Sequence, residues 1–130
     1  MSTADLVNKS YACFQSGDIP GLMECYSDNI EFIIKGGTTV PFAGTYHGKE
    51  ALMGFFQKLS ETIEFSKFDL VELVVGENNA AGFVDTSSTV RASGKSMASL
   101  IVHRIHVEDG KIVRFEYFPD TQEMHEAFQP

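Results

Sequence analysis

A histidine, His103, stands where a strand of a globular protein normally buries an aliphatic residue. The segment Ser96–Val107 has strong strand character, and its alternate residues are Met97, Ser99, Ile101, His103, Ile105 and Val107. A neutral imidazole donates from one nitrogen and accepts at the other, and its usual pKa suits proton transfer near neutral pH. We therefore expect His103 to face an apolar pocket as an acid/base group or hydrogen-bond donor; the alternative is a structural histidine paired with a neighbouring side chain.

The closing hairpin decides which side chains share a face with His103, and two registers are open. A two-residue Asp-Gly turn places His103 opposite Glu116, whereas a three-residue loop at Glu108–Gly110 places it opposite Phe115 and diagonal to Tyr117. The second register gathers apolar residues on one face: Ile101, Ile105, Val107, Val113, Phe115 and Tyr117. We favour it because segregation of apolar from polar side chains holds a sheet in register.

Other titratable residues are weaker candidates. His103 and His106 lie three residues apart on a strand and so point to opposite faces, and no metal site is expected. Glu31 and Asp85 each lie in a strand, where a lone carboxylate usually faces outward. A set of aromatic residues is predicted to line a pocket for a flat, apolar ligand, with core packing as the alternative: Phe14, Phe32, Phe55, Phe56, Phe115 and Tyr117.

The elements that position these residues are helices first and strands afterwards. Apolar spacing predicts one helix that ends near Gly17, a second that begins at Asp18 and a third that covers Lys49–Ser60. A short fourth helix is predicted after Pro119. Predicted strands are Ile30–Ile34, Ile63–Val75, Ala80–Arg91, Ser96–Val107 and Lys111–Phe118, with an irregular segment at Thr38–His47. Consecutive long strands joined by turns predict an antiparallel sheet, and helices confined mainly to the N-terminal half predict an α+β fold.

Composition limits the partners. The 130 residues fit one domain, 1–130, and the net charge of −8 opposes binding to nucleic acids or anionic membranes. Cys13 and Cys25 form no CxxC motif and are expected to be free thiols. The N-terminus has no signal-peptide pattern and no apolar run is long enough to span a membrane, so a cytoplasmic location is expected.

The chain resembles the nuclear transport factor 2-like superfamily, in its SnoaL-like and ketosteroid isomerase-like branch. Similar segments occur in the family's order: Tyr11–Leu22, Tyr26–Phe32, Gly44–Leu52, Glu108–Val113 and Asp120–Thr121. The resemblance implies a cystatin-like cone, in which a curved antiparallel sheet wraps around N-terminal helices and holds an apolar pocket. Members include isomerases, polyketide cyclases and non-catalytic binding modules, so the fold alone does not assign a reaction.

The resemblance also implies roles for individual residues. In an ungapped comparison with ketosteroid isomerase, the general base falls at Ile34, the tyrosine donor at Ser10 and the acidic donor at His103. Ile34 carries no proton, so we expect no useful ketosteroid isomerase activity. Some polyketide cyclases of the family use an aspartate near the end of the sheet, which points to Asp120; the alternative is that Asp120 caps a helix.

The leading hypothesis is a cofactor-free enzyme that transfers a proton on a small apolar carbonyl or polyketide-like compound. His103, Tyr117 and Asp120 are its candidate catalytic residues, with Tyr11 or Tyr46 as further helpers. The expected substrate-binding residues are Phe14, Phe32, Ile34, Phe55, Phe56, Ile101 and Phe115. The alternatives are a non-catalytic small-molecule binding module and a dimerisation module with a vestigial pocket. A homodimer is expected through the outer sheet face, which would carry Arg104, His106, Arg114, Glu116 and Phe118.

Overall fold

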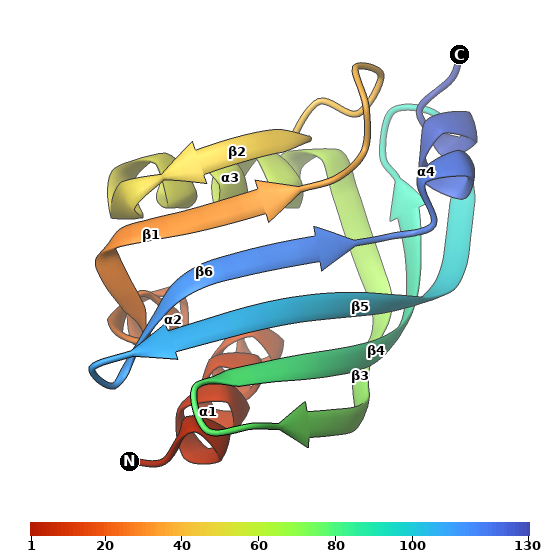
Figure 1. Ribbon diagram of the computed structural model, residues 1–130. Coiled ribbons are helices and arrows are strands. Elements are labelled where there is room, and N and C mark those ends of the chain that lie inside the picture. The colour runs from red at the N-terminus through yellow and green to blue at the C-terminus, as the bar shows by residue number, and fades with distance from the viewer.

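A six-stranded sheet and four helices make up the chain, as the computed structural model of residues 1–130 shows (Figure 1). The helices are α1 (Thr3–Ser16), α2 (Ile19–Glu24), α3 (Gly48–Thr62) and α4 (Thr121–Ala127). The strands are β1 (Tyr26–Ile34), β2 (Gly44–His47), β3 (Ile63–Val75), β4 (Asn79–Val90), β5 (Ser96–Glu108) and β6 (Lys111–Phe118). This confirms the α+β prediction. No helix is long and apolar enough to cross a membrane.

The strands lie in the order β2-β1-β6-β5-β4-β3, and the sheet curves around the helices. In Figure 1 helices α1, α2 and α3 lie behind the sheet, while its near face carries no helix. The prediction of an antiparallel sheet holds for every neighbouring pair except one, because β1 pairs with β6 in parallel. This pairing joins the first strand of the chain to its last strand and brings Phe32 beside Phe115.

Alternation of side chains fixes which face of each strand is buried. Along β4 every second residue is buried from Ala80 to Val90, the pattern of a strand with one face against a core. The helix predicted at Lys49–Ser60 is α3, and its apolar stripe packs on the concave side of the sheet with Leu52 and Phe55 almost fully buried. Burying each such side chain stabilises the fold by about 1.5–3 kcal/mol.

Two expectations about the strands near β1 were wrong. The first strand begins at Tyr26, four residues earlier than predicted, because the polar residues Ser27–Asn29 continue the extended backbone across a bulge in the pairing with β6. The segment predicted to be irregular ends in a short edge strand, β2, whose residues pair with Glu31–Ile34.

The hairpin between β5 and β6 also differs from the favoured register. Its loop is the two-residue turn Asp109-Gly110, whose positive φ values of 51° and 72° match a type I′ turn. A bulge between His106 and Val107 then shifts the pairing, so that His103 lies opposite Tyr117 and not opposite Phe115. The bulge changes the register by one residue, so the predicted shared face survives except at Val113, whose inward place is taken by Ile112.

Candidate functional site

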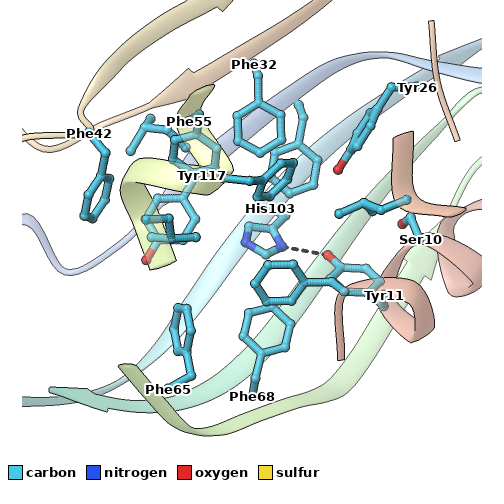
Figure 2. A pocket seen from close by; sticks show the side chains of 16 residues that line it. Ser10, Tyr11, Tyr26, Phe32, Phe42, Phe55, Phe65, Phe68, His103 and Tyr117 are labelled. Carbon is cyan, nitrogen blue, oxygen red and sulfur yellow. Dashed lines mark hydrogen bonds between the residues drawn. The ribbon is translucent and has the colours of Figure 1, made fainter. Parts of the chain in front are cut away.

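His103 projects from β5 into the interior of the protein, where aromatic rings surround it (Figure 2). Its ring centroid lies 4.6 Å from that of Phe115 and 5.5 Å from that of Tyr117. On the helix side, the Tyr11 hydroxyl lies 2.7 Å from Nδ1 of His103. The prediction that His103 shares an inner face with Phe115 and Tyr117 is therefore confirmed, and α1 supplies its hydrogen-bond partner.

The Tyr11–His103 hydrogen bond has a defined direction. A phenol O–H is a stronger acid than a neutral imidazole N–H, and an imidazole nitrogen accepts more strongly than a phenol oxygen. We therefore assign Tyr11 as the donor to Nδ1, which places the proton of the neutral imidazole on Nε2. His103 thus presents an N–H donor on the side of the ring away from Tyr11.

A glycine on the neighbouring strand makes room for this contact. Gly82 of β4 lies directly opposite His103 of β5. A Cβ atom at this position would overlap the hydroxyl oxygen of Tyr11 and lie 2.9 Å from its Cζ. Only a residue without a side chain lets Tyr11 reach His103, a role that the sequence analysis did not find.

Burial sets the protonation of the site. Loss of hydration lowers the pKa of His103 to about 3, because no anionic group lies close enough to stabilise the imidazolium. Burial likewise raises the pKa of Tyr11, Tyr26 and Tyr117. Near neutral pH the histidine and the three tyrosines are therefore all uncharged.

These residues border a cavity of about 60 Å³. Fourteen of its sixteen lining residues are hydrophobic or aromatic. The lining includes most of the residues predicted to form the site: Phe14, Phe32, Ile34, Phe55, Phe56, His103, Phe115 and Tyr117. It also includes residues not predicted for the pocket: Ser10, Leu22, Tyr26, Phe42, Leu59, Phe65 and Phe68.

Three predicted site residues lie outside the lining of this cavity: Asp120, Ile101 and the suggested helper Tyr46, whose hydroxyl donates to the carbonyl of Phe42 at 2.8 Å. Asp120 is exposed, and its carboxylate accepts a hydrogen bond from the backbone N–H of Glu123 at 3.0 Å, as the N-cap of α4. This is the arrangement given above as the alternative for Asp120. Ile101 faces inward from β5 but packs in the core beyond the cavity.

The other carboxylates named above are also directed elsewhere. Glu31 forms an ion pair with Arg114 at 3.1 Å, and Asp85 forms one with Lys67 at 2.6 Å. The residues that line the cavity therefore include no carboxylate. Its polar atoms are an imidazole and hydroxyl groups, which favour an uncharged ligand over a charged one.

Several cavity atoms lack a protein partner. Every nitrogen or oxygen of a buried side chain that is fully enclosed has a hydrogen-bond partner. Tyr11 is the single partner of His103, and no hydrogen bond involves the hydroxyl of Tyr26 or Tyr117. Nε2 of His103 and the Tyr26 hydroxyl oxygen consequently border free space, which for these two residues is the cavity, whereas Tyr117 also lines a second pocket beside Asp120 and Glu123.

Three phenylalanines and a leucine form one side of the cavity. Phe14, Phe56, Leu59 and Phe65 line both the cavity and an open groove between α1, α3 and β3. All four side chains are half-buried, with one side toward the cavity and the other toward the groove. We call these four residues the wall.

Comparisons with known proteins agree with this architecture. No match was found among curated proteins. An NTF2-like protein from Burkholderia thailandensis is 30% identical, with a TM-score of 0.90 and coverage of 100% of this chain and 99% of that one. An NTF2-like protein from Burkholderia xenovorans is 27% identical, with a TM-score of 0.88 and coverage of 97% and 95%.

A third similar structure carries a functional name. It is a Mesorhizobium loti protein provisionally named a SnoaL-like polyketide cyclase, 25% identical, with a TM-score of 0.78 and coverage of 92% of this chain and 100% of that one. The sequence pattern of the SnoaL-like domain matches residues 7–115, from the first turns of α1 to the middle of β6. The match includes Tyr11, Gly82 and His103, and the chain belongs to the SnoaL-like family.

Proposed function

We propose that the protein binds a small, uncharged and mainly apolar molecule in this cavity, through an oxygen atom that accepts a hydrogen bond from Nε2 of His103. The observation that carries the proposal is the unpartnered Nε2 of a neutral histidine that faces an apolar cavity. A buried hydrogen-bond donor without a partner destabilises the protein. A ligand carbonyl or hydroxyl oxygen that accepts from this donor therefore contributes to the binding free energy. The cavity as it stands has room for a small group, and the wall must move for a larger molecule.

The first test compares His103→Leu with His103→Gln, using cyclohexanone as the probe. We expect the leucine variant to bind cyclohexanone about tenfold more weakly than the wild type, since one hydrogen bond is lost. Glutamine keeps a donor and should retain part of the affinity. Methylcyclohexane, which has no oxygen, should bind all three proteins similarly in a titration followed by NMR.

His47→Leu is the matched control, because His47 is 71% exposed in its side chain and does not line the cavity. Its cyclohexanone affinity should equal that of the wild type. If His103→Leu binds cyclohexanone as tightly as the wild type does, the proposal is wrong.

A second candidate function is cofactor-free isomerase or cyclase chemistry on a carbonyl or polyketide-like compound. The direct Tyr11–His103 hydrogen bond favours it, since it links a proton donor to an acid/base group, and one structural neighbour is provisionally named a polyketide cyclase. We rank it second because a histidine whose pKa is lowered to about 3 is a weak base at neutral pH and no carboxylate supports it. An enzyme of this kind would speed deuterium exchange next to the carbonyl of cyclohexanone, and both His103 variants would lose that activity; a binding protein would show no such acceleration.

We also propose that two copies associate through the outer face of the sheet. Phe83, Val102 and Phe118 are successive paired residues on neighbouring strands of this face, and the Phe118 side chain is 37% exposed. Beside them, the carboxylate of Glu116 lies 3.6 Å from Arg104 and 3.3 Å from Arg114. An apolar centre next to charges of both signs is self-complementary, as a two-fold symmetric interface requires.

The expected species in sedimentation is therefore twice the 14.4 kDa of one chain. Val102→Glu should dissociate it, because the change places a charge in the apolar centre, whereas Met53→Glu on α3 should leave it intact. A wild-type protein that sediments only as a monomer at micromolar concentration would refute this interface. Within the same proposal we place the protein in the cytoplasm, where the free thiols of Cys13 and Cys25 would stay reduced.

A further inference from the structure

Tyr26 is the first residue of β1 and is almost fully buried, with 3% of its surface exposed. Its ring meets the edge of Phe32 with ring centroids 6.1 Å apart, and it contributes to the cavity lining. Figure 2 shows Tyr26 and Tyr117 on opposite sides of His103, with the Tyr26 hydroxyl turned toward the interior. The ring is thus held by packing while its polar end remains free.

Two other tyrosines of the chain, Tyr46 and Tyr11, show what a structural tyrosine does here. The Tyr46 hydroxyl donates to the backbone carbonyl of Phe42 at 2.8 Å, and the Tyr11 hydroxyl donates to His103. Tyr26 has no such partner, although it is more deeply buried than Tyr46. Its hydroxyl oxygen borders the cavity, since no fully enclosed polar atom is left unpaired.

A buried hydroxyl without a partner is unfavourable unless water or a ligand pairs with it. An ordered water needs two to four polar partners. Among the polar lining atoms, the hydroxyls of Ser10 and Tyr11 already donate, to the carbonyl of Val7 at 2.6 Å and to Nδ1 of His103 at 2.7 Å, so a water beside Tyr26 has few free partners. A ligand oxygen satisfies Tyr26 without this requirement.

Resting on the proposed function, we infer that Tyr26 is a second ligand-binding residue and that the ligand carries a second oxygen, apart from the one held by His103. The ligand class is then a small dioxygenated compound, such as a hydroxyketone or a diketone. Burial raises the pKa of Tyr26, so its hydroxyl remains a proton donor across the neutral range and also accepts from a ligand hydroxyl. The two groups project from different elements, His103 from β5 and Tyr26 from β1, and so fix the orientation of the ligand.

The test is a cycle of two proteins and two kinds of probe. The proteins are the wild type and Tyr26→Phe, and the probes are cyclohexanone and the hydroxycyclohexanones whose hydroxyl lies two or three carbons from the carbonyl. We expect the wild type to prefer the better hydroxycyclohexanone over cyclohexanone by about fivefold to tenfold. Tyr26→Phe should abolish this preference, so that it binds both kinds of probe alike. Tyr46→Phe is the matched control and should keep the preference.

The outcomes separate this inference from the proposed function. The inference is overturned if cyclohexanone binds in a His103-dependent way but the wild type shows no preference for either hydroxyketone. It is also overturned if Tyr26→Phe keeps the preference. In both cases the Tyr26 hydroxyl binds only water. If no probe binds the wild type, both fail. A second measurement does not depend on the folding of a variant, because it uses wild-type protein labelled with carbon-13 at the tyrosine Cζ atoms. The NMR signal of Tyr26 should shift when the hydroxyketone is added and not when cyclohexanone is added. A Tyr26 signal that the hydroxyketone does not shift also overturns the inference.

Discussion

Lowering the pH from 7 to 4.5 should destabilise the wild-type protein by about 2.5 kcal/mol more than the His103→Gln variant. Burial lowers the pKa of His103 from 6.5 to about 3, so between these values the unfolded chain binds a proton that the folded chain does not. Because protons stabilise the unfolded state in this range, the contribution is complete above pH 6.5 and is lost as the pH falls toward 3. Glutamine does not titrate and removes this loss.

The difference between the two proteins isolates the histidine. The rings that surround it belong to Tyr11, Phe68, Phe115 and Tyr117, and none of them changes charge in this range. All other groups are the same in both proteins, so their contributions cancel. Urea denaturation followed by circular dichroism at several pH values gives the two free energies of unfolding, and the exposed His47→Gln variant should follow the wild type. Parallel curves for the wild type and His103→Gln would show that the imidazole is not buried in its neutral form.

Gly82→Ala should cost about 2–4 kcal/mol of stability, a large effect for one methyl group. The new Cβ overlaps the Tyr11 hydroxyl, so either Tyr11 rotates into the cavity or β4 moves away from α1. Both responses break the hydrogen bond to Nδ1 of His103 and leave that nitrogen buried without a partner. Urea denaturation measures the loss.

Two further proteins sharpen this result. In a Tyr11→Phe background the overlapping oxygen is absent, so Gly82→Ala should cost less there, and the difference is the coupling between the two positions. Gly54→Ala on the exposed side of α3 meets no atom within 4 Å and should stabilise the protein by about 0.5–1 kcal/mol, since glycine is a poor helix former. An equal cost of Gly82→Ala with and without the Tyr11 hydroxyl would contradict the proposed clash.

The helices and strands were predictable from the sequence because the apolar pattern of each one repeats along its length. The apolar stripe of α3 and the alternation along β5 each appear several times within one element, so a single exception does not change the assignment. The hairpin register was not predictable, since Ile112 and Val113 are adjacent apolar residues and either one fits an inward position. In the structure Ile112 is buried and Val113 is only half-buried, as the bulge requires.

Some residues of the candidate site were likewise predictable from the sequence and others were not. His103 was found because a polar residue interrupts an apolar alternation. Tyr26 was missed because the polar residues Ser27–Asn29 resemble a loop. Tyr26 is nevertheless an even-numbered residue like Ile30, Phe32 and Ile34, so extending the alternation of that strand toward the N-terminus would have included it. The contribution of Gly82 depends on a contact between α1 and β4 that no local pattern records.

The wall has a consequence for rates. Since Phe14, Phe56, Leu59 and Phe65 lie between the cavity and the groove, a ligand molecule that enters from the groove crosses only while these side chains move aside. Association and dissociation then share one barrier, set by side-chain rearrangement and not by diffusion. A smaller residue in the outer part of the wall lowers that barrier in both directions, so residence time shortens while the equilibrium occupancy of the cavity changes little.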